Sequence, residues 1–169
     1  MTFASNTDLA ATAERVVELL TERGLTLALA ESCTGGLIGD LLTDVPGSSR
    51  CFLGGIVAYA NDAKVRLLGV PAAMLENFGS VSEQTVTAMA RGACERFGAD
   101  LGLAATGIAG PSGGTPEKPV GLVYLALAAG DGRCLVKRVV WHGSRRQNKL
   151  LSAQAALGLV EALLEASDT

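Results

Sequence analysis

The first residues suited to chemistry lie in the stretch "LALAESCTGG", where a short apolar run ends abruptly in polar side chains. Ser32 carries a hydroxyl that becomes a nucleophile once a base takes its proton. The residues alone leave a second interpretation open, because a serine here also suits the cap of the helix that begins near Gly35. Thr34 serves that capping role equally well.

A base for Ser32 has to come from elsewhere, because the single histidine, His142, has no obvious orienting partner in the sequence. Lys64 in "NDAK" is the better candidate, at the third position of a helix that Asn61 caps. The dipole of a helix N-terminus disfavours a cation and therefore lowers the pKa of a lysine there. The alternative is an ordinary surface lysine. Glu31 orients Ser32 or Lys64, or it caps backbone amides.

Tyr59 and two arginines extend this set of residues. Tyr59 ends the predicted strand before Lys64, and its hydroxyl relays a proton or holds Ser32, unless its ring packs on the core. Arg145 and Arg146 stand in the first turn of a predicted helix, where two cations oppose the macrodipole. Either the pair is solvated, or it binds an anion such as a phosphate, which suits the guanidinium fork.

The elements that must position these residues alternate between helix and strand along most of the chain. Apolar periodicity predicts helices near residues 7–23, 37–45, 61–69, 70–79, 80–97 and 144–165. Capping boxes at Ser80–Glu83 and Ser144–Gln147 open the last two. Short apolar runs predict strands at 25–30, 51–60, 100–106, 120–128 and 133–141, the last two joined as a hairpin by "AGDGR". We therefore predict one domain over residues 1–169, a three-layer α/β/α sandwich with a mixed, mostly parallel sheet.

Three polar loops with glycines follow three of the predicted strands. They are "ESCTGG", "YANDAK" and "TGIAGPSGGTPEKP". The carboxyl ends of parallel strands meet at one edge of a sheet, so the three loops are expected to converge there around a ligand. Backbone amides in such loops favour an anion. For any single loop, the glycines could equally serve tight turns alone.

Composition excludes several classes of protein. With 169 residues, of which 49% are apolar, the chain can bury a sizeable core, whereas a net charge of −3 and 4% aromatic residues argue against nucleic-acid binding. No apolar run is long enough to span a membrane, and "MTFASNTD" does not resemble a signal peptide. The four cysteines lack metal-site spacing, which indicates a reducing cytoplasm. A phosphoryl-transfer enzyme is disfavoured because the phosphate-binding motif G-x-x-x-x-G-K-[ST] is missing.

Longer motifs carry a specific resemblance. "AESCTGG", "PGSS", "GGIVAYANDAKVRLLGV", "GSVSEQT", "MARGA", "TGIAGPSGGTPEKPVGLVY" and "GSR" occur in this order over about residues 8–165. Together they resemble the CinA C-terminal domain family, whose enzymatic members are nicotinamide-nucleotide amidases (PncC). The resemblance implies an α/β fold, a homo-oligomer, and hydrolysis of nicotinamide mononucleotide to nicotinate mononucleotide and ammonia. It implies a small-molecule nucleotide substrate and no cofactor or metal.

The resemblance also implies roles for single residues. Ser32 is the nucleophile, Lys64 the base with Tyr59 beside it, and Ser49 in "PGSS" is a competing hydroxyl. The implied substrate pocket comprises Glu31, Thr34, Gly35, Gly36, Ser49, Thr106, Gly107, Gly110 and Arg145. Backbone amides around Thr34, Gly35 and Gly36 are expected to stabilise the oxyanion. Family members often carry an acidic residue where this chain has Ser144. The rival function is a non-catalytic nucleotide-binding or competence-associated regulatory module.

Overall fold

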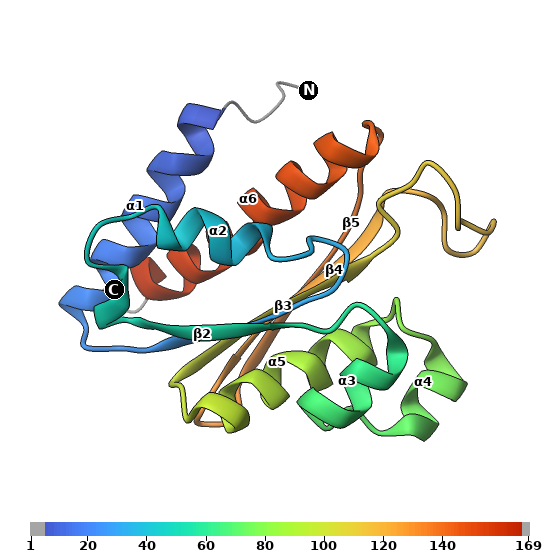
Figure 1. The fold of residues 1–169 in the computed structure, drawn as a ribbon, viewed down its shortest axis with the longest axis horizontal. Helices are drawn as coiled ribbons and strands as arrows, with labels where there is room; N and C mark the ends of the chain where they lie inside the picture. Colours follow the sequence, from blue (N-terminus) through green and yellow to red (C-terminus); the bar gives the residue numbers. More distant parts are fainter. Residues whose placement is uncertain (1–5, 167–169) are drawn as a thin grey trace.

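The computed structural model of the chain describes residues 6–166 (Figure 1). We expect no signal peptide in "MTFASNTD", and the first five residues of this stretch, 1–5, lie outside the described region. The helices are α1 (Asn6–Glu22), α2 (Leu37–Thr43), α3 (Asn61–Leu68), α4 (Ala72–Phe78), α5 (Glu83–Phe97) and α6 (Arg145–Ala166), with a short 3₁₀ helix η1 (Ser48–Arg50). The strands are β1 (Leu27–Glu31), β2 (Phe52–Val57), β3 (Leu101–Gly107), β4 (Leu122–Ala129) and β5 (Cys134–Val140).

The five strands form one sheet in the order β2-β1-β3-β4-β5. β1 runs parallel to both β2 and β3, whereas β4 is antiparallel to β3 and to β5. Only β4 is therefore reversed, which confirms the predicted mixed, mostly parallel sheet and the hairpin that joins β4 to β5. The carboxyl ends of β1, β2 and β3 lie at the same edge of the sheet.

Helices cover both faces of this sheet, which gives the predicted three layers (Figure 1). α1, α2 and α6 pack on the face that carries large side chains such as Leu29, and α5 packs on the face that carries small ones such as Ala30. The close approach of α5 depends on Gly102, because an added Cβ there would lie 2.1 Å from the carbonyl oxygen of Ala90. The alternation of leucine and alanine along the strands thus sets a wide layer on one side and a thin one on the other.

Two helix starts differ from the prediction. Ser82, and not Ser80, caps α5, because its Oγ accepts a hydrogen bond from the backbone N–H of Thr85. The cap of α3 is Ala60, which has no capping side chain, and Asn61 is the first helical residue. Sequence patterns locate helix ends only to within one or two residues, and the error here moves each start by that amount.

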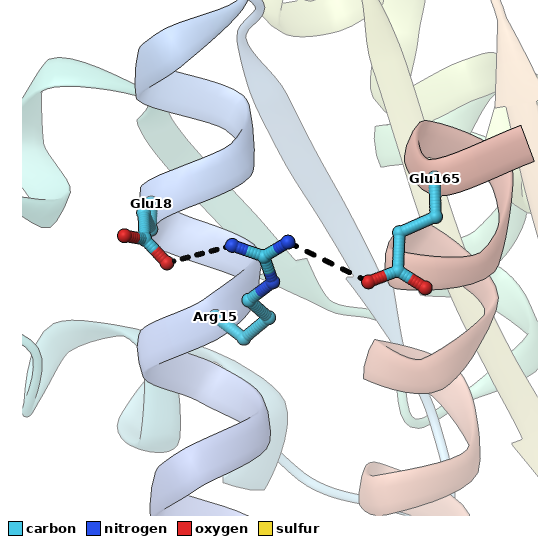
Figure 2. A network of polar contacts seen from close by, with 3 residues as sticks. All are labelled: Arg15, Glu18 and Glu165. Carbon is cyan, nitrogen blue, oxygen red and sulfur yellow. Dashed lines mark hydrogen bonds and ion pairs between the residues drawn. The ribbon is translucent and has the colours of Figure 1, made fainter. Parts of the chain in front are cut away.

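The predicted capping box of α6 is confirmed. The backbone N–H of Ser144 donates to Gln147 Oε1 at 2.8 Å, and the N–H of Gln147 donates to Ser144 Oγ at 3.4 Å. Farther along, α6 is tied to α1 by Arg15, which lies between Glu18 at 2.9 Å and Glu165 at 3.6 Å (Figure 2). These side chains are exposed, so the bridge adds little stability compared with the apolar contacts beneath it.

Candidate active site

A cleft of about 270 Å³ opens at the carboxyl edge of the sheet. It is lined by the turn after β1, the connection after β2, the loop after β3 and the start of α6. The three loops predicted to converge therefore do so. A larger cavity of about 430 Å³ lies over α5 between Leu68 and Glu95, but it contains neither Ser32 nor Lys64.

Ser32 and Lys64 lie next to each other at the floor of the cleft. Lys64 Nζ lies 3.0 Å from Ser32 Oγ, although the two residues are 32 positions apart in the chain. The same Nζ donates to the carbonyl oxygens of Ala58 at 2.9 Å and Tyr59 at 3.3 Å. Lys64 is only 1% exposed, so the surface-lysine alternative is wrong. The pair is bonded directly, as a nucleophile and its base must be.

Burial is the main influence on the protonation of Lys64. Removal from water disfavours the ammonium and lowers the pKa of Lys64 below its ordinary value of 10.5. A thiolate at Cys33 would oppose this effect, but burial raises the pKa of Cys33 to about 12 and keeps the thiol neutral. Within residues 6–166, no carboxylate pairs with Lys64. The direction of the shift agrees with the one expected from the sequence, and burial is its principal cause.

Glu31 caps backbone amides, which was one of its predicted alternatives. Its carboxylate accepts hydrogen bonds from the N–H groups of Gly36 at 3.0 Å, Ile38 at 3.1 Å and Gly39 at 2.9 Å. These N–H groups belong to the first turn of α2, where a negative charge matches the helix dipole. Glu31 therefore fixes the turn that carries Ser32 and does not contact the Ser32 or Lys64 side chain in the described structure.

The predicted oxyanion donors are mostly engaged elsewhere. The N–H of Gly36 is bonded to Glu31, and the N–H of Gly35 donates to the carbonyl of Ser32 at 3.1 Å. Thr34, Gly35 and Gly36 also do not line the cleft. Cys33 does line it, so the backbone N–H of Cys33 is the better candidate on this turn.

Tyr59 has a different partner from the one predicted. β2 ends at Val57, so Tyr59 lies in the connection to α3, and with 60% exposure its ring does not pack on the core. Its hydroxyl accepts a hydrogen bond from Arg145 Nη2 at 2.9 Å and is not bonded to Ser32. The sequence thus placed Tyr59 near the correct loop, while the contact of its hydroxyl depends on a residue 86 positions away.

The two arginines at the start of α6 differ sharply. Arg145 lines the cleft, and its Nη1 donates to the carbonyl of Gly110 at 2.8 Å. Both arginines are exposed, but Arg146 does not line the cleft and makes no side-chain hydrogen bond or ion pair within the described part of the chain. The solvated interpretation therefore holds for Arg146, whereas Arg145 faces the region where a ligand would bind.

The loop after β3 forms another wall of the cleft. Thr106, Gly107 and Gly110 line the cleft as predicted, and Thr106 Oγ1 donates to the carbonyl of Ser80 at 2.8 Å. Ser80 also lines the cleft, although the sequence pattern predicts only a helix cap there. Its position in "GSVSEQT", a motif that carries the resemblance, is the feature that could have identified it.

Sequence reasoning also missed Asn148. This buried side chain donates from Nδ2 to the carbonyl of Ala109 at 3.0 Å and accepts from the N–H of Gly143 at 3.0 Å. It thereby joins the start of α6 to the loop after β3 and supports the position of Arg145. The available indication was an asparagine on a helix face that, apart from Ser152, carries apolar residues.

Ser49 is not brought to the cleft. It is exposed in η1, which precedes β2, whereas Tyr59 and Lys64 follow the other end of that strand. β2 has six residues, which corresponds to about 20 Å at roughly 3.3 Å per residue. Within one chain, Ser49 therefore does not compete with Ser32 for Lys64.

Residues 6–166 contain neither a metal-type cluster of side chains nor a helix suited to crossing a membrane. Three or more histidine, cysteine or acidic side chains do not gather anywhere in this region as a metal site would require. The helices described here are all too short or too polar to cross a membrane.

Comparison with known proteins gives consistent matches. The model of the CinA C-terminal domain matches residues 9–164. A CinA-like protein from Chlorobaculum tepidum is 58% identical over 157 residues, covering 90% of this chain and 37% of that protein. A CinA-like protein from Geobacter sulfurreducens is 57% identical over 142 residues, covering 84% of this chain and 34% of that protein. The chain therefore spans little more than a third of the length of these relatives.

Solved structures match along nearly their whole length. The competence/damage inducible protein CihA from Agrobacterium tumefaciens is 43% identical with a TM-score of 0.91, covering 96% of this chain and 98% of that one. A CinA superfamily protein from Escherichia coli is 30% identical with a TM-score of 0.88, covering 96% of this chain and 94% of that one. From its fold and its sequence alike, the chain belongs to the CinA C-terminal domain family.

Proposed function

We propose that the chain is a nicotinamide-nucleotide amidase that converts nicotinamide mononucleotide and water to nicotinate mononucleotide and ammonia. The observation that carries this proposal is the 3.0 Å contact between Lys64 Nζ and Ser32 Oγ at the base of a cleft. A serine paired with a buried lysine is an arrangement suited to acyl transfer. Five of the seven motifs that carry the resemblance contribute residues to the lining of this cleft.

The hydrogen-bond pattern of Lys64 supports its role as the base. A neutral amine has two N–H donors and one lone pair. The carbonyls of Ala58 and Tyr59 accept the two N–H bonds, so the lone pair is left for the third neighbour, the hydroxyl of Ser32. Because burial lowers the pKa of Lys64, this neutral form is accessible at a lower pH than for a lysine in water.

The chemistry then runs in two steps. Ser32 Oγ attacks the carboxamide carbon while Lys64 takes the hydroxyl proton, and Lys64 returns that proton to the departing ammonia. Water attacks the resulting ester with Lys64 again as the base, which releases the carboxylate and restores Ser32. The N–H of Cys33 is the proposed donor to the oxyanion of both steps.

The charges in the cleft favour a substrate with an anionic group. Arg145 supplies a permanent positive charge to the lining, Lys64 is the other basic residue there, and no carboxylate is among the lining residues. Arg145 lies on a different element from Ser32, which suits a ligand whose phosphate is separate from its reacting amide. A guanidinium is well matched to phosphate oxygens.

The direct test is to incubate the purified protein with nicotinamide mononucleotide and to measure ammonia and nicotinate mononucleotide together. We expect both products in equal amounts. Binding of the nucleotide without release of ammonia would contradict the amidase and would favour a regulatory nucleotide-binding module.

The phosphate subsite is tested with a second substrate. Arg145→Ala should lower kcat/KM for the mononucleotide about ten- to a hundredfold, the equivalent of one charge-assisted contact, and change kcat/KM for nicotinamide riboside much less. Arg146→Ala is the matched control and should behave as the wild type. Equal proportional losses on both substrates would show that Arg145 does not bind the phosphate.

A further inference from the structure

Tyr59 contacts both halves of the candidate site. Its hydroxyl oxygen accepts from Arg145 Nη2 at 2.9 Å, and its backbone carbonyl accepts from Lys64 Nζ at 3.3 Å. The residue lies in the short connection 58–60 between β2 and α3, and its side chain is largely exposed beside the cleft. One residue thus links the arginine to the lysine by direct hydrogen bonds.

Arg145 is held at two points but keeps most of its donors. A guanidinium has five N–H groups, of which Gly110 takes one from Nη1 and Tyr59 takes one from Nη2. Three N–H groups remain for a ligand. The Tyr59 hydroxyl uses a lone pair toward Arg145, so its own O–H is also available to an anion. Holding the guanidinium in place before binding lowers the entropic cost of capturing that anion.

The same contact argues against a role for the Tyr59 hydroxyl in proton transfer. A relay would need a bond from this hydroxyl to Ser32 or to Lys64 Nζ. In the described structure its hydrogen-bond partner is Arg145 and neither member of the pair. Lys64 instead meets the backbone of Tyr59, which a change of side chain leaves in place.

We propose that Tyr59 couples an anion subsite at Arg145 to the Lys64–Ser32 pair. The ligand class is the dianion of a phosphate monoester, held by the free N–H groups of Arg145 and the O–H of Tyr59. Its binding fixes the 58–60 connection, whose carbonyls hold Lys64 Nζ, so that the anion improves both affinity and turnover. Tyr59 is therefore a positioning residue that selects anionic substrates. The statement on turnover rests on the proposed amidase function, whereas the statement on binding does not.

The binding part is tested with inorganic phosphate as the probe. Calorimetric titration is carried out on the wild type, Tyr59→Phe, Arg145→Ala and the control Arg146→Ala. We expect Tyr59→Phe to weaken phosphate binding about three- to tenfold, Arg145→Ala to weaken it further, and Arg146→Ala to leave it unchanged. Phosphate binding by Tyr59→Phe that is as tight as in the wild type, or tighter, overturns the proposal. Tighter binding would mean that Tyr59 competes with the anion for Arg145.

The coupling part is tested by supplying the anion separately from the amide. Phosphite is added to the wild type while it hydrolyses nicotinamide riboside, which has no phosphate of its own. We expect kcat/KM for the riboside to rise at least about threefold, and this activation to disappear in Tyr59→Phe. A Tyr59→Phe enzyme that is activated as strongly as the wild type overturns the coupling. In each protein the activation is the ratio of kcat/KM with phosphite to kcat/KM without it, so a change in the basal rate does not enter the comparison.

Failure of the amidase proposal is distinguishable from failure of this one. If neither the mononucleotide nor the riboside is hydrolysed, the calorimetry still decides whether Tyr59 belongs to the anion subsite. Amide hydrogen exchange then reports the coupling without turnover. Phosphate should slow exchange over residues 58–64 in the wild type and not in Tyr59→Phe, and equal slowing in both proteins counts against the coupling.

Discussion

Two neighbouring turns at the carboxyl edge of the sheet each bury one charge at the start of a helix. Glu31, the last residue of β1, is 3% exposed and accepts hydrogen bonds from three backbone N–H groups at the start of α2. After β2, Lys64 is 1% exposed inside the start of α3 and contacts two carbonyls and the hydroxyl of Ser32. The anion agrees with the dipole of its helix, whereas the cation opposes the dipole of its own.

The difference separates a group that stabilises from one that reacts. Glu31 accepts hydrogen bonds from three fixed backbone N–H groups and so holds its turn together. Lys64 has no carboxylate partner within residues 6–166, and its burial favours the neutral amine. A buried titratable group that its surroundings push toward the reactive form, next to a nucleophile, is characteristic of an active site.

The largest effect is expected at Ser32, the residue that links the two turns. Ser32→Ala removes one oxygen atom, so the proposed acyl-enzyme cannot form, and turnover of the mononucleotide should fall at least about a thousandfold. The melting temperature should remain close to that of the wild type, because the bonds of Glu31 to α2 are untouched. Product formation and thermal unfolding are measured on the same preparation. Turnover near the wild-type rate would remove Ser32 as the nucleophile.

A loss of about a hundredfold or more is expected for Lys64→Arg. This change keeps a cation beside Ser32, but a guanidinium cannot supply a neutral nitrogen as base. The wild-type kcat should rise with pH and reach a plateau, because only the neutral amine accepts the proton of Ser32. The midpoint should lie below 10.5, since burial lowers the pKa of Lys64. An arginine variant that retains most of the rate would show that Lys64 contributes only charge.

The sequence predicts this edge of the sheet well because the relevant patterns are local. Alternating helices and strands imply parallel strands, and the carboxyl ends of parallel strands meet. Ser32 and Lys64 each follow one such strand, so their proximity is a consequence of topology. The unusual position of a lysine at a helix start adds chemical information that the composition does not contain.

Side-chain partners are harder to predict because they depend on distances between remote elements. Tyr59 was placed at the correct loop, but nothing local indicates that its hydroxyl meets Arg145. Ser49 shares a family-like motif, yet the length of β2 separates it from Lys64. Asn148 acts between two segments that the sequence gives no reason to pair. The sequence motifs therefore predict which loops form the site more reliably than they predict which side chains are in contact.

A smaller effect, chiefly on stability, is expected at the other turn. In Glu31→Gln, one carboxylate oxygen becomes an NH₂ group that cannot accept the N–H bonds of α2. We expect the free energy of unfolding to fall by about 1–3 kcal/mol, which corresponds to a melting temperature lower by about 2–4 °C per kcal/mol. Asp40→Asn, at an exposed acid in the same helix, is the matched control. If Glu31→Gln unfolds like the wild type, the hydrogen bonds from the backbone N–H groups to Glu31 do not stabilise this turn.

The smallest effect is expected at Asp62, which tests whether burial alone distinguishes Lys64. Asp62 lies in the first turn of α3 with its side chain 73% exposed and is paired with Arg66 at 3.3 Å. Its charge favours the helix dipole, but water screens it, so Asp62→Asn should lower the free energy of unfolding by no more than about 0.5 kcal/mol. The midpoint of the pH–rate profile should stay at its wild-type value, because burial is the principal cause that lowers the pKa of Lys64. Denaturant unfolding and the pH dependence of kcat give the two measurements.

A shift of the midpoint by half a pH unit or more would mean that surface charge on α3 controls the base. The difference between Glu31 and Lys64 would then arise from the charges along their helices and not from burial.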